Sequence, residues 1–233
     1  LGQPYLKRVK TRKFSGIKRR GKYLLLECSK EFLIIHLGMS GSLRIADYGD
    51  IKKHDHIDIV FEDKSILRYC DPRRFGCFLW TDDPNNHFLL KNLGPEPLGN
   101  IFNGKYLFDV SRKRKTPVKN FIMNSKVVVG VGNIYANEAL FKAKIRPTRQ
   151  AGKISLERYE TLSMEIVSIL RKSINKGGTT LRDFVGSNNK PGYFKYELLV
   201  YGRARMTCRN CSSPLKEIRL SQRSSVYCPK CQA

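Results

Sequence analysis

The sequence has 233 residues and a mass of 26.8 kDa, and its 44 Lys and Arg against 20 Asp and Glu give a formal charge of +24. With 41% hydrophobic and 10% aromatic residues it can bury an ordinary core, so the composition argues against intrinsic disorder. Its apolar runs fall far short of the roughly 20 residues that span a bilayer. The charge indicates a polyanion as partner, although composition alone does not separate DNA from RNA.

The N-terminal stretch Leu1–Lys22 is mostly basic and polar and lacks the apolar core of a secretory signal. This predicts a soluble, intracellular protein, which we expect in the cytoplasm. An organelle transit peptide is the alternative, but Leu6 and Val9 are typical of a strand. Binding to a membrane surface would call for a basic amphipathic helix, and the sequence offers none.

Residues 1–98 are typical of a β-sandwich or barrel, because short β-like runs alternate with Gly, Asp and Lys turns. The expected strands are Tyr23–Glu27, Phe32–His36, Ser42–Ile45, His56–Phe61, Ser65–Tyr69 and Cys77–Trp80. The stretch Leu93–Asn100 is rich in Gly and Pro, and polar and basic residues follow it. We therefore expect a linker at residues 99–115.

The pattern becomes helical in residues 116–200. Apolar residues recur at three- and four-residue steps behind Ser155, a good N-cap, and Lys176-Gly177-Gly178 ends the helix. A second helix should begin near Asn133 and end before Pro147. Together with a small cysteine-rich hairpin at residues 201–233, these elements predict an α+β protein of two domains.

Four of the seven cysteines have the spacing of a zinc site. Cys208-x2-Cys211 is followed after sixteen residues by Cys228-x2-Cys231, and each pair places two thiolates on one side of a tetrahedral ion. Four thiolates leave no open position for water, so one structural Zn²⁺ is expected. Two redox pairs are the alternative, but they lack the βαβ context. The other cysteines, which we expect to be buried, are Cys28, Cys70 and Cys77.

The loop Val129–Asn133 holds two glycines directly before the expected helix. Backbone amides at such a helix start can bind an anion, and a DNA phosphate would fit. A tight turn between two helices with nothing bound fits the spacing equally well. Basic residues also recur in clusters in both halves of the chain, which together favour phosphate contacts: Lys18–Arg20, Arg73-Arg74, Arg112–Lys115, Arg203 with Arg205, and Arg219 with Arg223.

Several strings then match a known family in order between Lys18 and Cys231. They are Lys22–Leu25, His36–Gly41, His54–His56, Asp71–Gly76, Leu93–Leu98, Val129–Ala136, Lys190–Phe194 and the four-cysteine finger. This series closely resembles bacterial formamidopyrimidine-DNA glycosylase. The related endonuclease VIII branch fits less well, because Asp71–Gly76 and the segment Asp183–Phe194 look like the formamidopyrimidine branch.

The resemblance implies a monomeric base-excision repair enzyme with an N-terminal β-sandwich, a helix-two-turn-helix domain and a zinc finger. Such an enzyme removes 8-oxoguanine and ring-opened purines from double-stranded DNA and nicks the abasic site by β,δ-elimination. The damaged nucleotide must leave the stack, and in the family the residues that fill the hole correspond to Met39, Arg73 and Phe75. Without the match, Met39 and Phe75 would read as ordinary core residues.

The same resemblance assigns further roles. Lys22 would assist proton transfer in elimination beside the sugar-phosphate, and Arg223 in the zinc hairpin would serve the second elimination. DNA-contacting positions of the family correspond to His54, Arg73 and Arg114, and Asn133 would bind a phosphate. His36 and His87 are expected to be structural.

One part of the family pattern is missing. The family's nucleophile is the secondary amine of an N-terminal proline, followed by a glutamate that acts as the acid, whereas this sequence begins Leu1-Gly2-Gln3-Pro4. Pro4 cannot replace it, because an internal proline nitrogen is a tertiary amide. Two explanations stand: a truncated active glycosylase, or a remnant that binds damaged DNA without cutting it. From composition alone, a zinc-ribbon RNA-binding protein is a third hypothesis.

Overall fold

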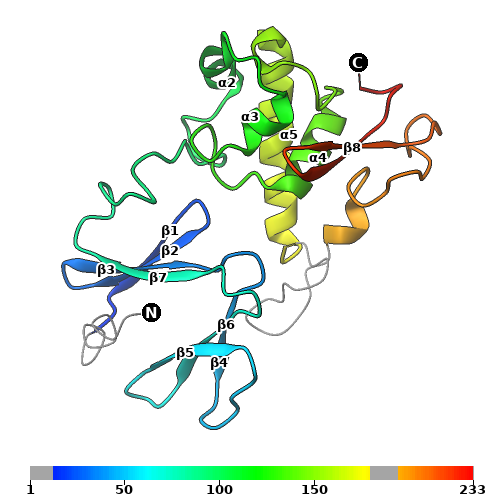
Figure 1. Cartoon of the computed structure of the whole chain (residues 1–233). Helices are drawn as coiled ribbons and strands as arrows, with labels where there is room; N and C mark the ends of the chain where they lie inside the picture. Colours follow the sequence, from blue (N-terminus) through cyan, green and yellow to red (C-terminus); the bar gives the residue numbers. More distant parts are fainter. Residues whose placement is uncertain (1–12, 179–193, 233) are drawn as a thin grey trace. The chain divides into compact units, whose positions relative to one another are not determined.

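The computed structural model describes residues 13–178 and 194–232 (Figure 1). These residues form two compact units, one of residues 13–91 with 176–178 and 194–195, the other of residues 92–175 with 196–232. Leu1, Pro4 and nearly all of the string Asp183–Phe194 lie outside the described residues. No helix in the described ranges is long and apolar enough to cross a membrane.

The first unit contains two antiparallel sheets. The four-stranded sheet has the order β1-β2-β3-β7, and the three-stranded sheet has the order β4-β6-β5. The strands are β1 (Gly16–Arg20), β2 (Tyr23–Cys28), β3 (Glu31–His36), β4 (Ser42–Ala46), β5 (Asp55–Val60), β6 (Ile66–Cys70) and β7 (Cys77–Thr81). Each of the six expected strands is confirmed to within one residue at either end.

Both sheets contribute to one hydrophobic core, which confirms the sandwich prediction. Leu26, Leu33 and Trp80 enter this core from the four-stranded sheet, and Ile59 and Tyr69 enter it from the other. Strand β1 was not predicted because its sequence is basic and its three central residues are exposed at the edge of the sheet. Basic residues are common on such edges, where they discourage pairing with other chains.

Two ion pairs tie β5 to the other two strands of its sheet. Arg68 is 1% exposed and forms two hydrogen bonds to Asp58, at 2.7 and 2.8 Å, while Arg44 forms two to Asp55, at 2.9 and 2.6 Å. The hydrogen bonds from Arg44 outweigh burial and lower the pKa of Asp55 to about 2. Because Asp55 follows His54 directly, these pairs also set the position of the His54 backbone.

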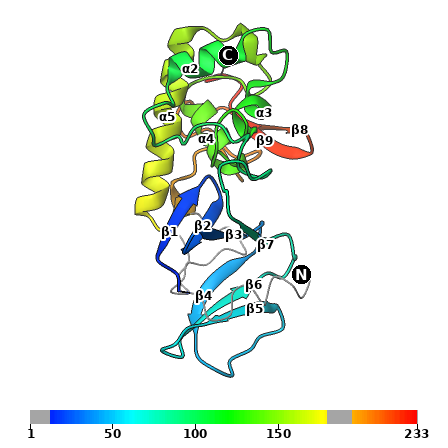
Figure 2. The same ribbon diagram turned by 90° about the vertical axis from the view of Figure 1, so that its left-hand side faces the viewer.

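The second unit is helical and ends in a hairpin (Figure 2). Its helices are α2 (Gly104–Ser111), α3 (Val118–Met123), α4 (Asn133–Lys142) and α5 (Leu156–Asn175), with short 3₁₀ turns at Ala151–Lys153 and Phe194–Glu197. Strands β8 (Lys216–Leu220) and β9 (Arg223–Tyr227) form the hairpin. Helices α4 and α5 confirm the two predicted helices, and the Ser155 hydroxyl accepts the Arg158 N–H at 3.4 Å.

Helix α2 lies inside residues 99–115, so this stretch is not the bare linker expected from the sequence. The Asn103 side chain caps α2 by accepting the Tyr106 N–H at 2.8 Å, and Leu107 is fully buried. Gly104 lets the helix approach α5 closely, because a Cβ there would meet the backbone of Glu160. Tertiary packing therefore stabilises a helix whose eight residues are too few to be stable in isolation.

Candidate nucleic-acid interface and zinc site

A buried carboxylate organises the edge of the sandwich that carries the predicted wedge residues. Asp71 is 0% exposed and accepts hydrogen bonds from the Ser40 hydroxyl at 2.7 Å and the Tyr69 hydroxyl at 2.8 Å. It also accepts the backbone N–H groups of Arg73 at 3.2 Å and Gly76 at 2.9 Å. One carboxylate thus ties the turn of residues 37–41 to the loop of residues 71–76.

The same bonds keep Asp71 ionised. Burial alone would raise the pKa of its carboxyl group, but the hydrogen bonds from Ser40, Gly76, Tyr69 and Arg73 outweigh it and lower this pKa to about 2. Burial, together with donation to Asp71, raises the pKa of the Tyr69 hydroxyl, which therefore stays protonated. The network holds a full negative charge at neutral pH.

Glycines allow the two segments to touch. Gly38 has a φ of +67°, and a Cβ there would lie 2.7 Å from the backbone of Phe75 and Gly76. A Cβ on Gly76 would overlap the Tyr69 hydroxyl. Met39 directly follows Gly38 and Phe75 directly precedes Gly76, so both side chains stand next to this close backbone contact.

The wedge residues are exposed. Met39 is 69% and Phe75 is 59% exposed, which excludes the core-packing interpretation of both. The Arg73 guanidinium lies 4.8 Å from the centroid of the Phe75 ring. His54 is half-buried, and its carbonyl oxygen accepts the Asp71 N–H at 3.0 Å. The structure thus brings Arg73 and Phe75 together and anchors the His54 backbone to the same loop.

Lys22 is exposed in the tight turn between β1 and β2. The next residue, Tyr23, places its ring 4.8 Å from the His36 ring. Burial, with a smaller contribution from the Lys22 charge, lowers the pKa of His36. The neutral ring accepts the Gly38 N–H on Nδ1 at 3.0 Å, so His36 supports the turn that presents Met39.

In the helical unit, Asn133 is the first residue of α4, as the sequence predicts for a phosphate-binding position. The preceding N-cap residue is Gly132, so no side chain caps the first-turn amides, and that turn contains no acidic residue. A helix start of this kind favours an anion. Arg114 is exposed after α2, and its carbonyl oxygen accepts the Gly152 N–H at 2.9 Å.

Arg223 is exposed at the tip of the β8–β9 hairpin, directly after the two-residue turn Ser221-Gln222. Buried Lys119 on α3 supports this tip by donating to the Ser224 carbonyl oxygen at 2.5 Å and the Ser225 hydroxyl at 2.6 Å. Burial, and to a smaller extent the Arg223 charge, lowers the pKa of Lys119 to about 8. The contacts of buried Lys119 therefore support the hairpin tip that carries Arg223.

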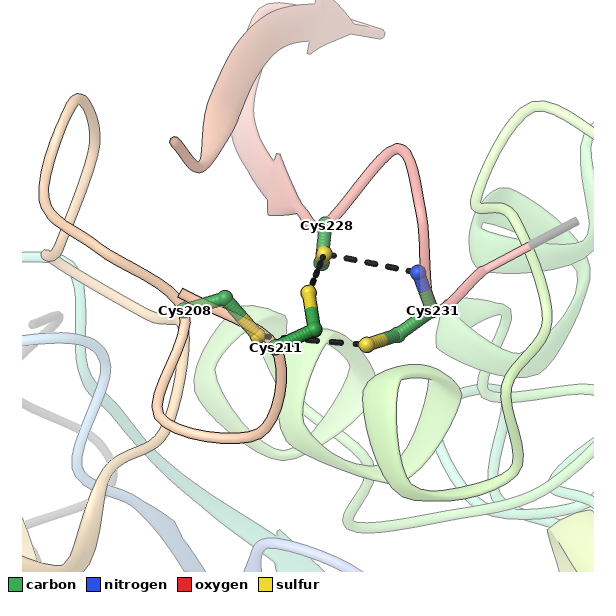
Figure 3. Close-up of side chains that lie close together, drawn as sticks. All are labelled: Cys208, Cys211, Cys228 and Cys231. Atoms are coloured by element: carbon green, nitrogen blue, oxygen red, sulfur yellow. Dashed lines mark hydrogen bonds between the residues drawn. The ribbon is translucent and has the colours of Figure 1, made fainter. Parts of the chain in front are cut away.

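The four cysteines predicted as zinc ligands come together beside this hairpin (Figure 3). Their sulfur atoms all lie within 4.8 Å of one another, with 3.4 Å between Cys211 and Cys228 and 3.9 Å between Cys208 and Cys231. Zn–S bonds of about 2.3 Å in a tetrahedron place sulfur atoms about 3.8 Å apart. The four thiols therefore fit one zinc ion.

Sequence reasoning missed the buried residues that position this machinery. Asp71 begins the segment Asp71–Gly76, but nothing in this sequence reveals that its carboxylate accepts four hydrogen bonds. Glu138 of α4 is 2% exposed and accepts the N–H groups of Leu199, Val200 and Tyr201, at 2.8 to 2.9 Å. An acidic residue among the apolar residues of α4 was the available signal.

Comparison with known families agrees with this organisation. Residues 3–78 match the family described as the formamidopyrimidine-DNA glycosylase N-terminal domain, and residues 93–185 match the formamidopyrimidine-DNA glycosylase H2TH domain. Residues 207–233 match the zinc finger found in FPG and IleRS. The second match begins before residue 99 and includes α2, in line with the structure.

Individual relatives cover nearly the whole chain. It is 58% identical over 218 residues to a formamidopyrimidine-DNA glycosylase of Marinobacter nauticus, which covers 93% of this chain and 81% of the relative. For the glycosylase of Methylococcus capsulatus the identity is 57% over 223 residues, covering 95% of this chain and 82% of the relative.

Solved structures show the same fold. A Lactococcus lactis FPG mutant in complex with a Fapy-dG containing DNA has a TM-score of 0.91 and 34% identity, covering 99% of this chain and 86% of that chain. A MutM in complex with carbocyclic 8-oxo-G containing DNA has a TM-score of 0.90 and 35% identity, covering 99% and 86%.

The ionised state of Asp71 predicts a pH dependence of stability. Because its pKa is lower in the folded chain than in the unfolded chain, it stabilises the fold above pH 4, and this contribution, about 2 kcal/mol, is lost as the pH falls from 4 to 2. Trp80, the single tryptophan, lies in the sandwich core and reports this unit alone. Urea unfolding followed by its fluorescence should show a steeper acid loss in the wild type than in Asp71→Asn. Equal slopes would contradict the assignment.

Proposed function

Because the chain belongs to the formamidopyrimidine-DNA glycosylase family, we propose that it excises oxidised purines, 8-oxoguanine and formamidopyrimidines, from double-stranded DNA and then cuts the strand at the abasic site. The observation that carries this proposal is the exposed set Met39, Arg73 and Phe75, held by the Asp71 network. Exposed apolar side chains on a rigid, glycine-packed support are suited to enter a base stack.

The three exposed residues Met39, Arg73 and Phe75 have different roles once the duplex is opened. Met39 and Phe75 replace the stacking that is lost when the damaged nucleotide leaves the helix, and Arg73 hydrogen-bonds the partner base left behind. The stacking of Arg73 over Phe75 supports this division, since one side chain steadies the other. His54 and Arg114 are expected to make further DNA contacts, and Asn133 is expected to bind a phosphate.

The chemical steps require amines and cations near the sugar. In the family, the secondary amine of an N-terminal proline attacks C1′, the C1′–N bond to the damaged base breaks, and a Schiff base forms. Lys22 assists proton transfer as the 3′ phosphate leaves in β-elimination, and Arg223 serves the δ-elimination that releases the 5′ phosphate. The exposed turn of Lys22 and the supported hairpin tip of Arg223 suit these roles.

Both alternatives to an active glycosylase have weaker support. A binder without catalysis is disfavoured by identities above 50% to proteins named formamidopyrimidine-DNA glycosylase over most of the chain. An RNA-binding zinc-ribbon protein would not need the glycosylase N-terminal and H2TH domains that this chain matches.

One structural Zn²⁺ would be held by Cys208, Cys211, Cys228 and Cys231. The donor set supports this assignment, because four thiolates close the coordination sphere and leave no position for catalysis. When bound, the ion would clamp both ends of the hairpin that carries Arg223. We expect the enzyme to act as a monomer on the bacterial nucleoid in the cytoplasm.

The role of Lys22 can be tested on the chain preceded by a family-type Pro-Glu start. This polypeptide should excise 8-oxoguanine and nick the duplex, and Lys22→Ala should slow nicking about 100-fold, since a positioned proton-transfer group contributes that much. Lys30→Ala, which changes an exposed lysine in the next turn, should leave nicking unchanged. Gel analysis of both products gives the rates. Normal nicking by Lys22→Ala would remove the proposed role.

Damage recognition is testable by binding alone. The chain should bind a duplex with an abasic analogue more tightly than the undamaged duplex, and Phe75→Ala should reduce this preference about tenfold, in the range of one lost stacking contact. Phe88→Ala, at another exposed phenylalanine of the same unit, is the control. Affinity should also fall steeply with salt. Equal affinities for the two duplexes, or stronger competition by structured RNA, would count against the proposal.

The zinc assignment predicts one Zn²⁺ per chain by native mass spectrometry. Cys208→Ser should lose the ion and weaken DNA binding, because the hairpin then lacks its clamp. Cys70→Ser, at a half-buried cysteine in β6 of the other unit, should retain the metal. Full metal content in Cys208→Ser would show that the ligand set is different.

A further inference from the structure

Helix α4 touches two parts of the proposed DNA-binding machinery through one buried side chain. Asn137 is 1% exposed, and its side-chain oxygen accepts the N–H of Val226 in β9 at 2.8 Å. Its side-chain nitrogen donates to the Asn133 carbonyl oxygen at 2.7 Å and to Asn133 Oδ1 at 3.3 Å. The side-chain amide of Asn137 therefore donates to Asn133 and accepts from Val226.

The contact with β9 completes the outer edge of the hairpin. In the β8–β9 ladder Val226 lies opposite Glu217, and its N–H points away from β8 to Asn137. Two residues earlier, the Ser224 carbonyl oxygen receives Lys119 Nζ. The side chains of Asn137 and Lys119 thus form hydrogen bonds with backbone groups of β9 that a third strand would otherwise pair with. They therefore determine where β9 lies on the helices, and with it Arg223, the first residue of β9.

The contact with Asn133 determines the orientation of an amide. Because Asn137 donates to Asn133 Oδ1, that oxygen already accepts a hydrogen bond within the protein, and Nδ2 is the part of the Asn133 amide that can donate to another partner. The oxygens of a DNA phosphate accept hydrogen bonds, so a protein group that binds them must be a hydrogen-bond donor. Asn133 stands at the first position of α4, where the helix start adds positive potential.

We propose that Asn137 is a positioning residue that presents the amide donor of Asn133 to a DNA phosphate and fixes the zinc hairpin, with Arg223, on the same helix. This rests on the proposed function of Asn133 in phosphate binding. Asn137 itself touches no DNA. The buried amide of Asn137 thus fixes the position of the β8–β9 hairpin relative to the start of α4.

A double-mutant cycle with Asn133 tests the proposal, with affinity for an abasic-analogue duplex as the readout. Asn137→Ala should weaken binding about tenfold in the wild-type background, the scale of one hydrogen bond to a charged group. In the Asn133→Ala background the same change should weaken binding much less, because the group that it orients is gone. A role confined to general stability would give equal losses in both backgrounds and would overturn the proposal.

Asn120→Ala is the matched control. Asn120 also donates from a helix to the hairpin, to the Ser221 hydroxyl at 2.7 Å, but it has no hydrogen bond to Asn133 in the described structure. Its effect on affinity should be small and the same in both backgrounds. If Asn137→Ala does not fold, Asn137→Ser carries the cycle, since a serine hydroxyl can keep the bond to the Asn133 carbonyl oxygen without reaching its side chain.

The outcomes separate this inference from its premise. If Asn133→Ala alone leaves affinity unchanged, the proposed phosphate contact fails and the inference fails with it. If Asn133→Ala weakens binding but the Asn137 effect is additive, only the positioning role is wrong. An Arg223→Ala background adds a second readout, because the Asn137→Ala effect on δ-elimination should also shrink there.

Discussion

The edge of the sandwich that carries Met39, Arg73 and Phe75 depends on the ionised carboxylate of Asp71. It accepts two hydroxyl donors and two backbone N–H groups, and these four bonds hold the turn that carries Met39 against the loop that carries Arg73 and Phe75. A buried charge is costly unless hydrogen bonds satisfy it, so the loss of any one of these bonds destabilises the whole arrangement. This explains how two large apolar side chains stay exposed on a rigid support.

The helical unit uses the same principle with different residues. Glu138 accepts three successive N–H groups of residues 199–201, and Lys119 and Asn137 satisfy the outer edge of β9. Glu138 thus fixes a segment outside the helices and strands, and Lys119 and Asn137 fix the unpaired edge of a two-stranded hairpin. Several of the buried polar groups therefore position a loop and a hairpin tip.

Much of the fold and part of the site follow from local signals in the sequence. Short β-like runs between turn residues marked six strands, three- and four-residue steps marked α5, and the cysteine spacing marked the expected zinc ligands. These signals act over a few residues and reflect which face of an element is buried. The helix α2 and the edge strand β1 were missed, because a short helix and a basic edge strand are stabilised mainly by neighbours distant in sequence.

By itself the sequence determined the two-part α+β organisation, the four cysteines that cluster and, through its resemblance to a family, the residues proposed to contact DNA. The tertiary structure decided how those residues are presented: that Met39 and Phe75 are exposed, that Asp71 is charged, and that Asn137 joins Asn133 to β9. The physical reason is separation along the chain. A hydrogen bond between Asn137 and Val226, or between Lys119 and Ser224, depends on geometry that no local pattern of residues encodes.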